Sequence, residues 1–598
     1  MQPGAPILVF AAVMFASAAR ADEPAWRPLG RAAFREAGDA GLPVMLWSTA
    51  PWNRDHFLWP GHLFADSTLA ATLARRAIAV RADASRFPEL RDVWALESGL
   101  LPAVHFLDEH GRVFASFPPP EAEELVYWLE EYADPADRPP AAGRRPGAVL
   151  DPGIGPPDDV IARELLERLL AGTSPLGSVH ADVDLSPLMF LNEWGAWRGD
   201  PRLADVLDTT LGTLLASPLF DRSDGGFHRA FATADGGVVH REKLLRANAV
   251  AGEALACRFA TSGRLEFGAD ALRIVRCLNG RFRTRAATLY SGSLAADVYA
   301  PSDGSLVMTG EEWYARGAEA RHLVGAPPRS ADVPVGANWR LVEAFSHYFR
   351  AFGDERFSQA VRTAAAALGP GSFDATGAAC RELDSPRVGN LRDQGDVGSG
   401  LLAWHAITGD PSALDAARAV ARAIRDRFRR DDGSLRDLAI DADLPDEVLS
   451  APDRPEFQGA ALRFLTDLSV VTAEAEWHDL AVAGLEAWRD RLPAGEVGLG
   501  ELGRAAFRSS VPPPLVVCDA VPGTEEGDRL GALAQRIADP TLCVRWIAPG
   551  DRIARARFGF VEGEEPALRI VWGDTSPALR TAVTYRRAYE RARERLLR

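Results

Sequence analysis

The sequence predicts a multi-domain α+β protein: an N-terminal α/β domain, a long helical segment that closes into an (α/α)6 toroid, and a small C-terminal α/β region. Three observations support this fold class. Short apolar runs of strand length lie near the N-terminus, long amphipathic stretches separated by Gly-Asp turns fill the middle, and strand-like runs return after residue 505. The 598 residues exceed one ordinary domain, and a hydrophobic content of 47% is enough for several cores.

The first 21 residues are typical of an export signal. The apolar run from Ile7 to Ala19 is too short to span a bilayer comfortably, and Ala19-Arg20-Ala21 supplies a small-x-small cleavage pattern. An uncleaved membrane anchor is the alternative. No later segment has the continuous apolar length of a membrane span, so we expect a periplasmic or secreted mature chain without a span after cleavage.

Charge and cysteine usage exclude several classes of partner and cofactor. A formal net charge of −16 argues against nucleic acid or an anionic membrane as a partner. The five cysteines are an odd number without a C-x-x-C motif, which favours buried thiols over a disulfide framework and gives structural zinc no support. We therefore expect no cofactor and no metal.

The first domain, residues 22–136, has the element order of a thioredoxin-like fold. The order β-α-β and then β-β-α fits such a fold of about a hundred residues. The predicted elements are a strand over 42–48, a helix over 64–73, a strand over 77–83, a hairpin over 99–114 with its turn at 109–111, and a helix over 121–132.

A connector rich in Pro and Gly, residues 137–157, separates this domain from the helical segment, residues 158–505. Helical hairpins recur there at spacings of about sixty residues, which favours a closed toroid over an open solenoid with shorter repeats. The predicted helix pairs are 344–352 with 355–368, 401–408 with 411–428, and 459–473 with 478–492. Strand-like runs at 515–518, 542–547 and 568–572, with helices over 528–537 and 577–598, predict the small α/β region, residues 506–598.

Lys243 is the only lysine of the chain, and it lies in a segment dense in glycine and histidine. Residues 227–233 and 237–240 predict a hairpin at the mouth of the toroid. On a helix beginning near His240, residues 240 and 243 share a face, so His240 and Lys243 would point together towards a ligand while Glu242 faces Arg246. The alternative is that a single lysine survived by chance.

Motifs along the chain resemble the family typified by spermatogenesis-associated protein 20, whose members join a thioredoxin domain to a helical barrel. The resemblance covers most of residues 26–480. Its specific parts are Gly225-Gly226-Phe227-His228-Arg229 and Val239-His240-Arg241-Glu242-Lys243, with Phe64, Asp66, Asp83 and the Leu101-Pro102 pair, a candidate cis-proline, as weaker matches. Where that family has Thr-Cys-His-Trp-Cys-His, this chain has Thr49-Ala50-Pro51-Trp52-Asn53-Arg54.

The missing cysteines have a direct chemical consequence. Thiol–disulfide exchange needs an attacking thiolate and a resolving thiol, and neither Ala50 nor Asn53 supplies one. We therefore expect a redox-inactive front domain that binds or supports a partner, and a redox chaperone is disfavoured. Asp55, His56 and His62 follow this turn, but their spacing matches no compact set of metal ligands.

Barrels of this type resemble those of sugar epimerases and glycoside hydrolases, which implies a carbohydrate-like ligand by fold analogy. Glycoside hydrolysis needs two carboxylates, for which Asp297 and Asp393 are the candidates. Epimerisation needs acid–base groups on both faces of the substrate, for which His228 and His240 are the candidates. Each residue also has a structural interpretation: Asp393 as a helix cap, His228 as a hydrogen-bonded core histidine, and Glu242 as the partner of Arg246.

Two functions follow from these observations. The leading hypothesis is a carbohydrate-active enzyme, an epimerase or glycosidase, with catalytic residues among His228, His240, Glu242, Lys243, Asp297 and Asp393. The alternative is a non-catalytic envelope protein that binds or assembles a protein partner through the thioredoxin-like domain.

Overall fold

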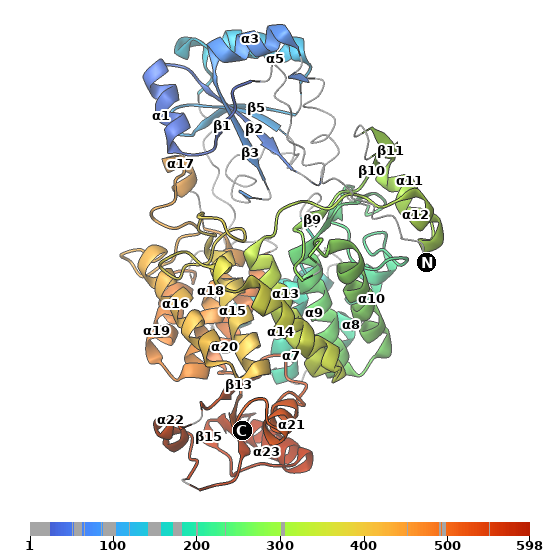
Figure 1. The fold of residues 1–598 in the computed structure, drawn as a ribbon, viewed down its shortest axis with the longest axis vertical. Helices are drawn as coiled ribbons and strands as arrows, with labels where there is room; N and C mark the ends of the chain where they lie inside the picture. The colour runs from blue at the N-terminus through green and yellow to red at the C-terminus, as the bar shows by residue number, and fades with distance from the viewer. Residues whose placement is uncertain are drawn as a thin grey trace, which may run out of the picture.

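The computed structural model describes residues 24–50, 52, 63–64, 66–84, 86–87, 103–118, 120–140, 157–170, 182–198, 201–233, 235–286, 288–300, 305–450, 453–489, 492, 498–548, 550–561 and 563–597. Three parts follow one another along the longest axis in Figure 1: an N-terminal sheet with its helices, a body of paired helices, and a small C-terminal α/β part. The predicted export signal, most of the connector, Pro102 and the residues Asp55, His56 and His62 lie outside the described residues.

The N-terminal part is built on a five-stranded mixed sheet in the order β1-β3-β2-β4-β5. The strands β1 (Arg27–Pro28), β3 (Ile78–Asp83) and β2 (Val44–Thr49) run parallel, and β4 (Ala103–Leu107) and β5 (Val113–Phe117) add antiparallel pairs. The strands predicted over 42–48 and 77–83 and the described part of the hairpin predicted over 99–114, from Ala103 on, are therefore confirmed.

Both faces of this sheet are covered by helices because the side chains of β2 alternate between two apolar cores. Val44 and Leu46 pack with α1 (Arg31–Ala40), while Met45 and Trp47 pack with α3 (Ser67–Arg76) and α5 (Ala122–Glu131). Every residue of β2 is buried, as expected for the central strand of a sheet that is covered on both sides.

The middle of the chain is a closed ring of helices, which confirms the predicted (α/α)6 toroid. Each inner helix packs against the next, and the last packs against the first. In chain order the inner helices are α7 (Ser186–Arg198), α9 (Leu245–Ser262), α13 (Val335–Phe352), α15 (Leu391–Thr408), α18 (Pro455–Thr472) and α20 (Leu499–Ser510). The outer helices, each packed on an inner one, are α6 (Pro157–Leu170), α8 (Pro201–Ala216), α10 (Leu265–Cys277), α14 (Glu355–Leu368), α16 (Pro411–Arg427) and α19 (Ala475–Glu486).

The two ends of the toroid differ. At one end, short turns such as Gly353-Asp354 and Gly409-Asp410 lead from an inner helix to the next outer helix; the glycine ends the first helix at positive φ and the aspartate caps the second. At the other end, long segments run from outer helices to the N-termini of inner ones. We call this end the mouth.

Helix α15 begins at Leu391, ten residues before the predicted start, because glycines inside it look like a turn in the sequence. Gly395 and Gly398 lie against α18, where a Cβ atom would come within 2.4 Å of Ala460 and 2.5 Å of Phe464. The glycines are therefore there for close packing between inner helices, not for a break in the chain.

The C-terminal part has a four-stranded sheet in the order β13-β12-β14-β15. Strands β12 (Leu515–Asp519), β13 (Cys543–Trp546) and β14 (Ala567–Trp572) match the predicted ones; β15 is Asp574–Thr575, and the helices are α21 (Glu525–Ala534), α22 (Arg552–Arg557) and α23 (Ala582–Leu597). This part packs on the short-turn end of the toroid, where Trp546 donates hydrogen bonds to His405 and Ala406.

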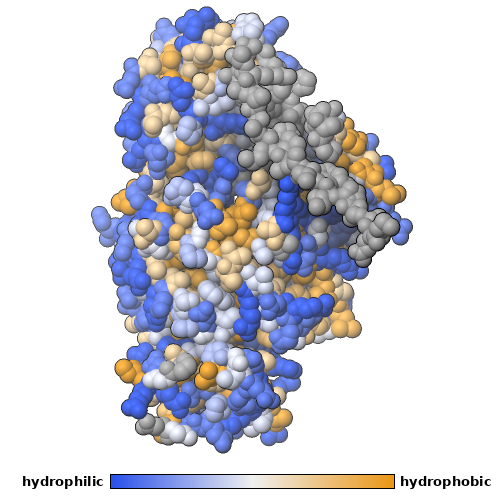
Figure 2. All heavy atoms as spheres, viewed as in Figure 1, coloured by the Kyte–Doolittle hydropathy of each residue, from blue (hydrophilic) through white to orange (hydrophobic). Residues whose placement is uncertain are grey.

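Hydrophilic residues cover most of the face seen in Figure 2, with hydrophobic residues interspersed among them. None of the helices in the described ranges combines the length and the apolar character that crossing a bilayer requires.

Candidate functional site

The segment around Lys243 folds differently from the prediction. The hairpin is present, as β6 (Ala230–Phe231) paired with β7 (Val239–His240). No helix begins at His240, however: Lys243 and Leu244 form strand β8, paired with β9 (Ser293–Leu294), and α9 begins only at Leu245. The predicted shared helical face of His240 and Lys243 is therefore wrong, because both residues are in extended backbone on different strands.

Lys243 is the centre of a buried polar cluster in the wall of the toroid. Its Nζ donates to Asp221 Oδ2 at 2.9 Å and to the carbonyl of Gly225 at 2.6 Å, and its side chain is 2% exposed. Arg321, on the short helix α12 (Ala318–Val324), donates to the same Asp221 oxygen at 2.8 Å. The cluster thereby ties together the two long segments that precede α9 and α13.

The charges of this cluster are fixed by its contacts. Burial opposes the charged form of Lys243, but Cys277, Tyr314 and Asp221 outweigh burial and raise the pKa of the ammonium. Burial likewise opposes the charge of Asp221, yet Lys243 and Arg321 hold the pKa of this carboxyl well below its usual value. A permanently charged, paired lysine is suited to holding structure and not to exchanging protons.

His228 is a core histidine. It is 1% exposed, its Nδ1 lies 2.9 Å from the carbonyl oxygen of Arg241, and its ring contacts that of Tyr314 edge-on. Burial, assisted by the charge of Lys243, lowers the pKa of His228 well below its usual value, so the ring is neutral. The structure does not pair it with His240, which is half-buried in β7.

Glu242 pairs with Arg229 and not with Arg246, so this predicted pair is also wrong. Glu242 Oε2 lies 3.6 Å from Arg229 Nε, and burial raises the pKa of the Glu242 carboxyl. The Arg229 guanidinium also covers the ring of Trp52, 4.5 Å from its centroid. Trp52 is the matched tryptophan of the turn that carries cysteines in the resembled family, so this residue packs against the mouth of the toroid.

Asp297 and Asp393 have separate structural partners. Asp297 accepts a hydrogen bond from the backbone N–H of Gly310 at 2.5 Å. Asp393 closes a capping box with Asn390 at the start of α15 and accepts two hydrogen bonds of 2.8 Å from Arg381. Asp393 thus has the capping role that was its structural interpretation, and no contact joins the two carboxylates within the described ranges.

A second polar group lies at the N-terminal ends of the inner helices. Arg246, the second residue of α9, pairs with Asp396 of α15 at 2.7 Å. Arg392, the second residue of α15, lies over the ring of Phe457 of α18, with its guanidinium carbon 4.5 Å from the centroid. We call Arg246, Arg392 and Asp396 the mouth cluster. Arg246 and Arg392 remain partly exposed, whereas Asp396 is buried.

Below the mouth cluster, an ion-pair network fills the axis of the toroid. Arg504 lies 2.8 Å from Glu193, 3.5 Å from Glu253 and 3.4 Å from Glu501. Arg463 lies 2.6 Å from Glu343. All of these side chains are nearly or fully buried and come from inner helices. The network is thus a polar core in which arginines compensate the buried carboxylates.

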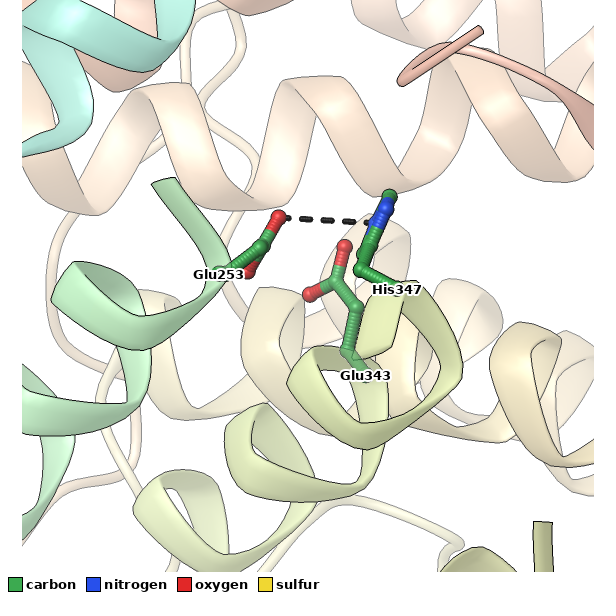
Figure 3. Close-up of side chains that lie close together, drawn as sticks. All are labelled: Glu253, Glu343 and His347. Carbon is green, nitrogen blue, oxygen red and sulfur yellow. Dashed lines mark ion pairs between the residues drawn. The ribbon is translucent and has the colours of Figure 1, made fainter. Parts of the chain in front are cut away.

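Within this network, Glu253, Glu343 and His347 have potential ligand atoms within 4.8 Å of one another (Figure 3). Arginines already hold both carboxylates: Arg340 lies 2.9 Å from Glu253, and Arg463 binds Glu343. Burial raises the pKa of Glu253 to about 7 and lowers the pKa of His347 well below its usual value. A divalent cation would have to displace these guanidinium groups, so the geometry favours a protein-internal network.

The N-terminal part covers the mouth. Arg86 pairs with Glu382 at 2.8 Å, and the backbone carbonyl of Arg86 accepts a hydrogen bond from Arg387 at 2.8 Å. Arg31 donates through its backbone N–H to Asp443. Phe34 and Leu46 share an apolar cluster with three leucine and valine side chains of the segment before α18, namely Leu438, Leu444 and Val448.

Comparisons with known proteins return fold-level similarities only. Neither a family model nor a curated protein matches the sequence. Similar solved structures include a sugar epimerase from a ruminal bacterium, with 14% identity and a TM-score of 0.43 over 59% of this chain and 99% of that one. A D-mannose isomerase has 12% identity and a TM-score of 0.43 over 60% of this chain and 99% of that one. An unsaturated glucuronyl hydrolase from Bacillus sp. GL1 has 12% identity and a TM-score of 0.41 over 59% of this chain and 95% of that one. With TM-scores below 0.5, the toroid is assigned from its own closed ring of helix contacts.

Sequence reasoning missed the mouth cluster and the axial network. The sequence does carry a pattern that indicates the axial network: charged residues recur at helical spacing within otherwise apolar stretches. Examples are Arg340, Glu343 and His347, and also Glu501, Arg504 and Arg508. In a helix that is apolar all round, such residues face a buried polar axis.

Proposed function

We propose that this chain binds a carbohydrate-like ligand at the mouth of the toroid, around Arg246, Arg392 and Asp396. One observation carries the proposal: charged side chains of two inner helices, α9 and α15, converge at the end that the N-terminal part covers, and two of them keep exposed surface there. The guanidinium groups of Arg246 and Arg392 supply the hydrogen-bond donors that a hydroxyl-rich ligand needs.

The contacts of the predicted catalytic residues favour a binding function over catalysis. Lys243, His228 and Asp393 each direct polar atoms at protein partners and are almost fully buried. General acid–base chemistry requires a group within reach of the substrate proton, whereas the polar atoms of these groups are bonded to Asp221, to the Arg241 carbonyl and to Arg381, respectively. Residues outside this set would have to carry any epimerase- or hydrolase-like step.

We propose further that the N-terminal part is a thioredoxin-like domain without redox activity. The strand order β1-β3-β2-β4-β5 with its mixed directions supports the fold. Ala50 is fully buried at a position where the resembled family has a cysteine, and all five cysteines of the chain are buried free thiols. Trp52, two residues after Ala50, packs on Arg229 of the toroid.

Export to the periplasm or the medium remains a proposal based on the first 21 residues. N-terminal sequencing of the protein recovered from the native host would test it, with cleavage after Ala21 as the expected result.

The ligand proposal is tested by a glycan array followed by calorimetric titration of the full chain. Arg246→Met should weaken glycan binding at least tenfold, because a charge-assisted hydrogen bond contributes about 1.5–3 kcal/mol. Arg356→Met is the matched control, since the Arg356 side chain is 89% exposed on the outer helix α14 and, among the described residues, pairs only with Asp354. Absence of glycan binding, together with a co-purifying protein partner, would favour the assembly function instead.

A further inference from the structure

Among the described residues, Arg392 differs from Arg246 and Arg381 because no acidic side chain pairs with its guanidinium. Its Nε is buried without a hydrogen bond, and within the described ranges no carboxylate or carbonyl pairs with its guanidinium. Arg246 and Arg381, by contrast, each hold an aspartate of α15. A partly buried guanidinium usually has an anionic or carbonyl partner, because its donors lose water on burial.

The described acids near Arg392 do not pair with its guanidinium. Burial and the positive charge of Arg246 lower the pKa of Arg392 to about 10, even though Asp393, Asp396 and Glu456 oppose this shift. Those acids are engaged elsewhere: Asp396 binds Arg246, Asp393 binds Arg381, and Glu456 has a partner of its own. Within the described part of the chain, this guanidinium therefore has no hydrogen-bonded or ion-paired acid.

Position and shape favour a bound ligand as the compensating group. The guanidinium carbon of Arg392 lies 4.5 Å from the centroid of the Phe457 ring, so the ring contacts the guanidinium. Arg392 keeps exposed surface beside the partly exposed Arg246, at the end of the toroid covered by the N-terminal part. The planar fork of a guanidinium is matched to a carboxylate, which can accept two parallel hydrogen bonds from it.

We infer that the ligand of the mouth is an acidic carbohydrate whose carboxylate pairs with Arg392. This inference rests on the proposed function, which supplies the carbohydrate part, and adds the charge of the ligand and the residue that recognises it. A sulfate or phosphate ester would offer the same anionic oxygens, so the test must distinguish these sources from a carboxylate.

The experiment uses the full chain and an array that carries neutral, carboxylated, and sulfated or phosphorylated glycans, with titration calorimetry on the strongest members of each class. Carboxylated glycans should bind about tenfold or more tightly than their neutral counterparts, a preference expected for one charge-assisted pair. Arg392→Gln should abolish this preference, Arg392→Lys should keep only part of it, and Arg356→Gln should leave it unchanged.

Equal affinity for neutral and carboxylated glycans would overturn the inference but leave the proposed function in place. A preference for carboxylated glycans that survives in Arg392→Gln would have the same consequence. A preference for sulfated or phosphorylated glycans alone would overturn the assignment of a carboxylate. Failure of every glycan class to bind would overturn both the inference and the proposed function. Circular dichroism and thermal unfolding of each variant would show that the fold is retained.

Discussion

Lys243 and Asp221 form an ion pair of 2.9 Å in which both side chains are 2% exposed. The pair joins β8 to the long segment after α8, and Arg321 shares the same carboxylate. The one lysine of the chain therefore stabilises the wall of the toroid instead of facing a ligand, and the first prediction follows from this position.

Lys243→Met should destabilise the chain by about 3–5 kcal/mol, since removing one partner of a buried pair leaves the other charge poorly compensated. Lys243→Arg should also destabilise it, because the wider guanidinium does not fit the space between Asp221 Oδ2 and the carbonyl of Gly225. Urea denaturation measures both effects. A variant of unchanged stability that loses glycan binding would contradict the structural role.

Arg504→Met should have a larger effect than Lys243→Met on folding. Arg504 is fully buried and faces Glu193, Glu253 and Glu501, so its removal leaves several buried carboxylates without one of their compensating charges. We expect a loss of more than about 4 kcal/mol, visible as low soluble yield and an early urea transition. Arg356→Met, on the exposed face of α14, is the control and should behave like the unmodified chain.

His405 links stability to pH through the contact between the toroid and the C-terminal part. Its Nε2 accepts a hydrogen bond from the Trp546 N–H at 3.1 Å, and its Nδ1 lies 2.9 Å from the carbonyl oxygen of Asp410. These contacts fit the neutral ring, and burial lowers the pKa of His405 from 6.5 to about 4.

Because the folded chain binds this proton less readily than the unfolded chain, the contribution of His405 is fully present above pH 6.5. It should decline as the pH falls from 6.5 to 4, by about 3 kcal/mol at most, at 1.36 kcal/mol for each pKa unit. The stability difference between the unmodified chain and His405→Gln, measured by urea denaturation across this range, should shrink accordingly. A difference independent of pH would show that His405 titrates normally.

The thiols should be unreactive in the folded chain. All five cysteines are buried, and burial raises the pKa of each thiol, to about 11 for Cys380. Ellman's reagent should therefore modify almost no thiol in buffer and five thiols in denaturant, and the chain should not accelerate the reduction of insulin by dithiothreitol. Catalysed insulin reduction would contradict the proposal of a redox-inactive front domain.

The sequence predicted the toroid well because paired helices leave local signals. The Gly-Asp turns at 353–354 and 409–410 mark the change from inner to outer helices, and both are observed. The start of α15 was missed because Gly395 and Gly398 meet a constraint from α18 that is distant in the sequence.

The candidate site was predicted less well, for a physical reason. Lys243 and His228 stand out in the sequence by residue type and motif, yet both are buried, whereas the mouth cluster consists of arginines and an aspartate of ordinary appearance. Which arginine lacks a partner depends on contacts between α9, α15 and α18, and no single stretch of sequence contains that information.

Glycan titration of two paired variants tests the central claim most directly: that the ligand binds at the mouth cluster and not at the Lys243 cluster. Arg246→Met and Lys243→Met would be compared under conditions in which both remain folded, with Arg356→Met as control. We predict that Arg246→Met weakens binding at least tenfold while folded Lys243→Met binds normally. Normal binding by Arg246→Met together with lost binding by Lys243→Met would contradict the claim.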